Sequence, residues 1–161
     1  MNTLRDIIRR AYELLVAGAS SLRSPLLLAL RLYFFWQLFL IGEGKLSNLG
    51  KVSEYFASLH IPLPTLNAFF IGSLECFGSL LLMIGLGSRL LSLLIMISMT
   101  VAYLAGDFEA VSSFFADPDK FVKADPFPFL LTAVIVLVFG PGSFSIDALI
   151  KRMLHCGEKA E

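Results

Sequence analysis

The sequence predicts an all-α membrane protein: a four-transmembrane-helix bundle preceded by an N-terminal amphipathic interfacial helix. Three observations lead to this fold class. The 161-residue chain is 57% hydrophobic and only 16% charged, and its mean hydropathy of +0.78 is far outside the range of soluble domains. Four long apolar runs carry the excess. The remaining polar positions are too few to cover the surface of a soluble bundle.

The N-terminal segment, residues 1–24, is expected to form an amphipathic helix. Within residues 3–18, apolar side chains recur at helical spacing opposite a cationic face. Such a helix can lie in the headgroup layer of a membrane until Ser24-Pro25 turns the chain into the bilayer. The alternative is a cytoplasmic helix that packs on a partner protein.

The membrane domain is expected over residues 25–150. A hydrocarbon core about 30 Å thick takes about 20 helical residues, so each apolar run is long enough or nearly long enough to cross it. The four expected spans are residues 25–42, 62–87, 89–106 and 126–146. Residues 151–161 then form a cytoplasmic tail.

The connections between the spans are unequal. The second and third spans are joined by little more than Gly85–Arg89, which predicts a tight helical hairpin. The connections at about residues 43–61 and 107–126 are longer and rich in aromatic residues, and we expect short helices there. The fourth span should break at Gly140-Pro141-Gly142 and resume as a short segment.

The distribution of Lys and Arg predicts the orientation. Eight of them fall in the N-terminal segment, the second-to-third connection and the tail, whereas four fall in the two longer connections. By the positive-inside rule, both termini are expected to be cytoplasmic. No basic patch has the extent of a nucleic-acid footprint, so nucleic acid is not an expected partner.

Glu75 is the residue that most needs an explanation. It is the only charged residue in the apolar run 61–88. An ionised carboxylate near the middle of a bilayer costs at least about 2.5–3.5 kcal/mol, so it needs a partner or a purpose. Helical spacing places Gly72, Gly78 and Ser79 on nearly the same face. Small residues allow a second helix to approach closely, so this face should point into the bundle.

Arg31 is the expected partner of Glu75. It lies inside the first span, on a stripe that continues to Lys45, and its side chain can lean toward the carboxylate. Arg89 and Tyr103, on adjacent stripes of the third span, are candidates to join the pair. Two interpretations stay open: a salt bridge that only fixes helix register, and a polar pocket that binds a head group or quinone oxygen or exchanges a proton.

The familiar catalytic chemistries are mostly absent from the sequence. Cys76 lies in a span and Cys156 in the tail, without a C-x-x-C pair. His60 and His155 are expected on opposite sides of the membrane, so they cannot ligate one haem, and no metal site is expected. No phosphate-binding loop or nucleophile elbow is present. The residues alone therefore give no evident cofactor and no autonomous catalytic motif.

Several short motifs share their order and spacing with a known family. They are Arg31, Gly42-Glu43-Gly44-Lys45, His60–Pro64, Glu75-Cys76-Phe77-Gly78, Gly85–Arg89, Ala124–Phe129 and Phe139–Asp147. Together they resemble the DoxX family of small bacterial membrane proteins, over roughly residues 25–150. The Cys that follows Glu75 departs from the small or aliphatic residue often found there.

The resemblance implies a four-helix, multi-pass protein of the bacterial cytoplasmic (inner) membrane. It places the family's polar membrane positions on Arg31, Lys45, Glu75 and Arg89. The family takes its name from subunits of thiosulfate:quinone oxidoreductase, which makes a quinone the implied cofactor. Other members are linked to membrane oxidoreductase complexes with thiol- or superoxide-handling partners.

Three functional hypotheses follow. The leading one is a component of a membrane-associated redox or thiol-stress system, with an inter-helix pocket for a quinone or lipid; if catalytic, it would act as a subunit of a quinone-linked oxidoreductase. The second is a non-catalytic scaffold whose outer connections dock a periplasmic partner protein. The third is a small-molecule transporter, which would need a homo-oligomer because four spans without an inverted repeat form no path alone.

Overall fold

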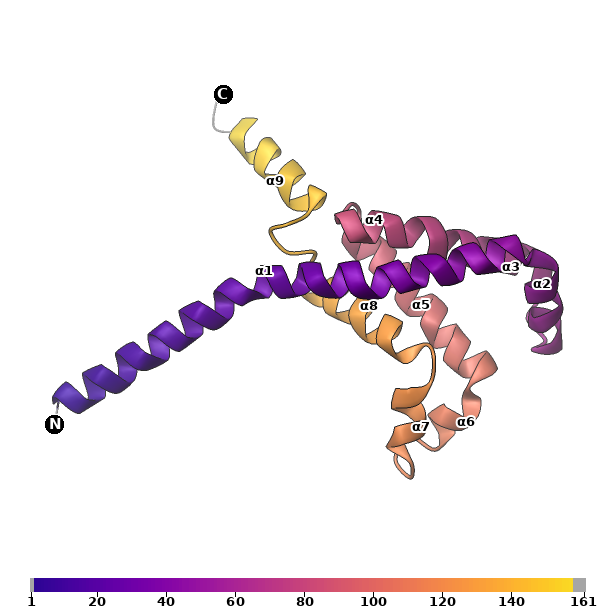
Figure 1. Cartoon of the computed structure of the whole chain (residues 1–161), viewed down its shortest axis with the longest axis horizontal. Helices are drawn as coiled ribbons and strands as arrows, with labels where there is room; N and C mark the ends of the chain where they lie inside the picture. Colours follow the sequence, from indigo (N-terminus) through magenta and orange to yellow (C-terminus); the bar gives the residue numbers. More distant parts are fainter. Residues whose placement is uncertain (1, 158–161) are drawn as a thin grey trace.

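The computed structural model describes residues 2–157, with side chains from residue 5 to residue 154, and throughout this range its regular structure is helical. Figure 1 shows the arrangement. The elements in chain order are α1 (Asn2–Ser47), α2 (Leu49–Ser58), α3 (Pro64–Ser73), the π-helical turn η1 (Leu74–Gly78), α4 (Ser79–Ile84), α5 (Ser88–Gly106), α6 (Phe108–Ser112), α7 (Pro118–Lys123), α8 (Phe127–Phe139) and α9 (Ile146–Gly157). The tail is therefore described only in part, and the side chains of His155, Cys156 and Lys159 lie outside the described residues.

Helix α1 is continuous through Pro25, so Ser24-Pro25 does not end the N-terminal helix. Proline removes one backbone hydrogen bond and crowds the preceding turn, which bends a long helix without ending it. Figure 1 shows the two halves of α1 meeting at an angle. The side chains of residues 5–23 are exposed, so the first half projects from the bundle.

The second membrane helix is built from α3, η1 and α4, which run without interruption from Pro64 to Ile84. It lies alongside the second half of α1, with α2 across the far end (Figure 1). The hairpin that follows is as tight as the sequence predicts, since α5 begins at Ser88. Gly85 and Gly87 have φ of 75° and 61°, a left-handed conformation that residues with a Cβ rarely adopt.

The apolar core lies between α1, α4, α5 and α8, and α8 packs mainly along α5. Each of the four helices turns one apolar stripe inward. The core residues are Phe35, Leu38, Leu82, Ile95, Met99, Phe129, Ala133 and Val136. Most other large apolar side chains on the long helices are exposed, as expected where lipid takes the place of water.

Within the part of the chain that the structure describes, three helices are long and apolar enough to cross a membrane: the stretches Arg5–Ser47, Pro64–Ile84 and Ser88–Gly106. The fourth expected span, residues 126–146, contains only the 13-residue apolar helix α8. At 1.5 Å per residue α8 is about 20 Å long, which is short of a hydrocarbon core. It ends where Gly140 takes a φ of 76° before Pro141, at the predicted break.

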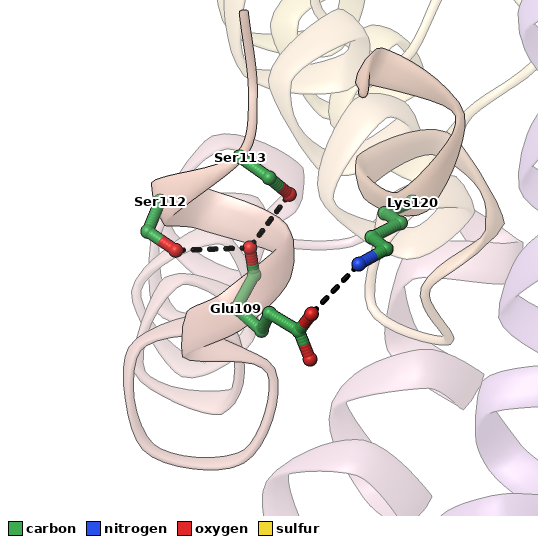
Figure 2. Close-up of polar contacts among 4 residues, drawn as sticks. All are labelled: Glu109, Ser112, Ser113 and Lys120. Atoms are coloured by element: carbon green, nitrogen blue, oxygen red, sulfur yellow. Dashed lines mark hydrogen bonds and ion pairs between the residues drawn. The ribbon is translucent and has the colours of Figure 1, made fainter. Parts of the chain in front are cut away.

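The two longer connections contain the short helices expected of them, α2 in the first and α6 and α7 in the second. An ion pair joins α6 to α7, with Lys120 Nζ 2.7 Å from Glu109 Oε1. Figure 2 shows this pair together with the hydroxyls of Ser112 and Ser113, which donate to the carbonyl oxygen of Glu109. The hydrogen bond and charge of Lys120 lower the pKa of Glu109.

Candidate functional site

Glu75 lies in the π-helical turn η1, in the middle of the second membrane helix. Its carboxylate is buried, with 1% of the residue exposed. A π turn inserts one extra residue into a helix and occurs frequently at functional sites. Here the π turn lies at the one charged residue of an otherwise apolar stretch. The sequence pattern indicated Glu75 but not the π turn.

The second membrane helix packs tightly against α1 at Gly42. A Cβ atom added to Gly42 would lie 2.7 Å from the carbonyl carbon of Glu75, and closer still to the backbone nitrogen of Cys76. Only glycine therefore allows the two backbones to approach this closely. The Gly42 contact holds Glu75 against the C-terminal part of α1.

The ion-pair partner of Glu75 is Lys45, three residues beyond Gly42 on the same side of α1. Lys45 Nζ lies 2.6 Å from Glu75 Oε1. The Lys45 side chain is 27% exposed and that of Glu75 only 2%. The ammonium group thus lies between the buried carboxylate and the outside of the bundle, and this Lys45–Glu75 pair is the candidate site.

One oxygen of the pair has no protein partner. Glu75 Oε2 is buried and accepts no hydrogen bond from any residue that the structure describes. A buried carboxylate oxygen without a donor is costly, and such groups in folded proteins are usually matched by a ligand or an ordered water. The site therefore has a free acceptor beside an ammonium donor, which is a donor–acceptor set for a small polar head group.

The expected Arg31–Glu75 salt bridge is wrong. The Arg31 guanidinium donates instead to backbone carbonyls, through Nη2 to Phe144 at 2.7 Å and to Met83 at 3.4 Å, and through Nη1 to Pro141. Met83 lies eight residues beyond Glu75 in the same helix, which is about 12 Å along its axis. Arg31 is thus too far toward the other end of the bundle to reach the carboxylate.

Arg31 serves the irregular segment 140–145, between α8 and α9. Its guanidinium is fully buried and satisfies carbonyls that no helix pairs. Arg23 adds a bond to the Phe139 carbonyl at 2.8 Å, and Ser24 Oγ contacts Ser143. Buried backbone carbonyls outside regular helices need such hydrogen-bond partners, so Arg31 has a structural role here.

Asp147 joins the start of α9 to the start of α5 at the same end of the molecule. The sequence motif did not reveal this role. Its carboxylate accepts hydrogen bonds from the N–H groups of Gly87 at 2.8 Å and Ser88 at 2.9 Å, at the start of α5. Burial raises the pKa of Asp147, but these bonds and the positive charge of Arg31 outweigh it, so the pKa lies below its ordinary value.

The two remaining predicted site residues lie away from the Lys45–Glu75 pair. Arg89 is exposed near Gly140, at the end of the bundle that holds Arg31. Tyr103 is buried at the opposite end of α5, where its hydroxyl donates to the Phe121 carbonyl at 2.7 Å and its ring stacks on that of Phe121. Of the five predicted residues, only Lys45 and Glu75 contact each other.

A second feature lies in the connection between α5 and α8. Between α6 and α7 the surface has an open hollow of about 310 Å³, lined by Gly106, Asp107, Glu109, Ala110, Lys120, Lys123 and Ala124. Figure 2 shows the Glu109–Lys120 pair that borders it. Nearby Phe115 is 96% exposed. Among the described residues, no group of three or more His, Cys, Asp or Glu side chains is placed to hold a metal ion.

Comparison with known proteins gives one match. The DoxX family model covers residues 26–108, just over half of the chain and the part that contains Arg31, Gly42, Lys45 and Glu75. The match ends before the last apolar helix and the Gly140-Pro141-Gly142 motif, so it is shorter than the expected resemblance. No curated protein and no solved structure matches the chain. The chain is an integral membrane protein and belongs to the DoxX family.

Proposed function

We propose that this protein is a component of a membrane-associated redox or thiol-stress system whose Lys45–Glu75 pair binds the polar head of a quinone or lipid. The observation that carries this proposal is the buried ion pair with a free carboxylate oxygen, at a π-helical turn. A salt bridge that only fixed helix register would need neither the free oxygen nor the π turn.

The donor and acceptor atoms of the Lys45–Glu75 pair fit the head group of a quinone and of its reduced quinol form. Lys45 Nζ can donate to a quinone carbonyl, and Glu75 Oε2 can accept from a quinol hydroxyl. A bound quinone would supply reversible two-electron, two-proton chemistry. The protein's role is to orient the head group and exclude water. The apolar side chains exposed on α1 and on the second membrane helix would contact the quinone tail where it lies in the bilayer.

We also propose that the chain crosses the inner membrane four times, with both termini cytoplasmic. Segment 140–145 is held against the start of the first crossing by Arg23, Ser24 and Arg31, so α8 returns the chain from the α6–α7 end to the end where α1 enters. α8 and this satisfied irregular segment together make up the fourth crossing. The exposed first half of α1 is then an interfacial helix.

The binding proposal is tested by titrating purified protein with a soluble quinone analogue and following Trp36, the only tryptophan. Trp36 lies nine residues from Lys45, about 14 Å along α1, and is half exposed to lipid. Saturable quenching is expected for the wild type, and at least tenfold weaker binding for Glu75→Gln. Glu43→Gln makes the same chemical change at an exposed position nearby and should bind as the wild type does.

Non-saturable quenching, or equal affinities for wild type and Glu75→Gln, would overturn the quinone proposal. The same titration with a short-chain phospholipid separates a lipid from a quinone as the ligand. Competition between the two would place both at the same pair.

The second candidate function is a scaffold that docks a periplasmic partner protein. The hollow between α6 and α7, with its charged lining and the exposed Phe115 ring nearby, favours this alternative. A cross-linker placed at Phe115 would capture a discrete partner from intact cells, and the capture would be unaffected by Glu75→Gln. No captured partner, or capture lost in Glu75→Gln, would contradict the scaffold function.

A further inference from the structure

The C-terminal helix α9 has an apolar face that no other described element covers. Its apolar residues recur at i, i+3, i+4, i+7 and i+8, which places them on one side of a helix. This α9 apolar face consists of Ile146, Leu149, Ile150, Met153 and Leu154. The last four are 43–66% exposed. Figure 1 shows α9 leaving the bundle at the end opposite α2.

The start of α9 is fixed to the end of the membrane bundle. The N–H of Asp147 donates to the Gly85 carbonyl at 2.9 Å, and its carboxylate accepts from Gly87 and Ser88. Ser145 Oγ accepts from the Ala148 N–H at 3.2 Å. α9 therefore begins beside the hairpin that joins two helices long enough to cross a membrane.

The charges on α9 fit a lipid surface. Lys151 and Arg152 lie on the side of the helix opposite the α9 apolar face, by helical spacing. Long basic side chains on such a helix can reach headgroup phosphates while the apolar face enters the boundary with the acyl chains. Anionic headgroups attract basic residues held close to the membrane.

We propose that the α9 apolar face binds the surface of the membrane that the bundle crosses, and that Lys151 and Arg152 favour anionic headgroups there. A bilayer is favoured over a partner protein because, in the four-crossing topology proposed above, the fixed start of α9 lies at the membrane surface. Held this way, the helix has a high effective concentration at the surface and needs little additional affinity to stay bound.

The test uses the full chain in liposomes, with tryptophan as a depth reporter. In a Trp36→Phe background, Met153→Trp reports from the apolar face and Arg152→Trp from the opposite side; both positions are exposed, so folding should be unaffected. Brominated lipid should quench Met153→Trp several-fold more than Arg152→Trp, and aqueous acrylamide should show the reverse order.

The headgroup preference is tested with the same reporter. The emission of Met153→Trp should shift further to the blue in vesicles of phosphatidylcholine with phosphatidylglycerol than in phosphatidylcholine alone, and adding Arg152→Gln should reduce that difference. Equal access of acrylamide to both reporters would overturn the proposal. Protection of Met153→Trp from both quenchers would also overturn it, because a protein partner or a second copy would then cover the face. An absence of dependence on phosphatidylglycerol would overturn the headgroup preference.

Discussion

At the scale of single residues, the Lys45–Glu75 pair is asymmetric. Glu75 is almost fully buried, whereas Lys45 is 27% exposed and has a long stem that can reach the headgroup layer. The two partners therefore depend on each other unequally. Losing Lys45 leaves a buried carboxylate with no counter-charge, but losing the charge of Glu75 leaves an ammonium that can move toward water.

This asymmetry predicts that Lys45→Met destabilises the protein more than Glu75→Gln. Removing one partner of a buried ion pair, so that the other charge stays buried without a counter-charge, lowers the free energy of unfolding by about 3–5 kcal/mol. The Tm in detergent should fall by several degrees for Lys45→Met, and combining it with Glu75→Gln should recover most of that loss. Lys51→Met, on the exposed surface of α2, is the control and should leave Tm unchanged. Additive losses in the double variant would show that the two side chains do not interact.

Arg31 is expected to be irreplaceable even by lysine. Its planar guanidinium bonds three carbonyls in different directions, and a lysine ammonium on a different stem cannot match that geometry. Each lost charge-assisted bond is worth about 1.5–3 kcal/mol. Arg31→Lys should therefore lower Tm clearly, while Arg89→Lys at an exposed position should not. A Tm for Arg31→Lys equal to that of the wild type would contradict the structural role.

At the scale of helices, the contact between α1 and η1 depends on a glycine. Gly42→Ala would place a methyl group inside the backbone of η1, so it should destabilise the protein and weaken ligand binding together. Gly44→Ala is a matched control in the same helix, since its Cβ would meet nothing within 4 Å. Replacing a helical glycine by alanine is otherwise favourable by about 0.5–1 kcal/mol, so Gly44→Ala should hold or raise Tm. Similar Tm values for the two variants would rule out the close approach.

The start of α5 is expected to be acid-labile. The pKa of Asp147 is lower in the folded protein than its ordinary value of 3.8. Its contribution to stability is therefore complete above about pH 4 and is lost as the pH falls through the folded-state pKa. As the pH is lowered below about 4, Tm should fall for the wild type and fall less for Asp147→Asn. Parallel curves would show that Asp147 does not stabilise this end.

At the scale of the whole molecule, most of the fold could be predicted from the order of apolar, glycine and proline residues. Apolar runs separated by glycine and proline were enough to predict the membrane class, the tight hairpin at Gly85 and the break at Gly140, because each depends on local chemistry. The sequence did not indicate that the helix continues through Pro25, since a proline bends or ends a helix according to what packs around it.

The site could be predicted only in part. Glu75 and Lys45 were recognisable as polar groups in an apolar setting. Hydropathy indicates where a residue lies along the membrane normal, but it does not indicate which side chain on a neighbouring helix that residue contacts. The sequence therefore paired Glu75 with Arg31. The π turn and the hydrogen bonds from Arg31 to the loop at 140–145 depend on contacts between α1 and distant segments, so local sequence did not indicate them.

The most direct test of the Lys45–Glu75 site is native mass spectrometry of protein taken from its own membrane in lipid nanodiscs. A quinone or a specific lipid should remain bound to the wild type and to the control Glu54→Gln, whose side chain is exposed on α2. The same molecule should be lost from Glu75→Gln and from Lys45→Met. Identical bound molecules in all four proteins would contradict the assignment of this pair as the binding site.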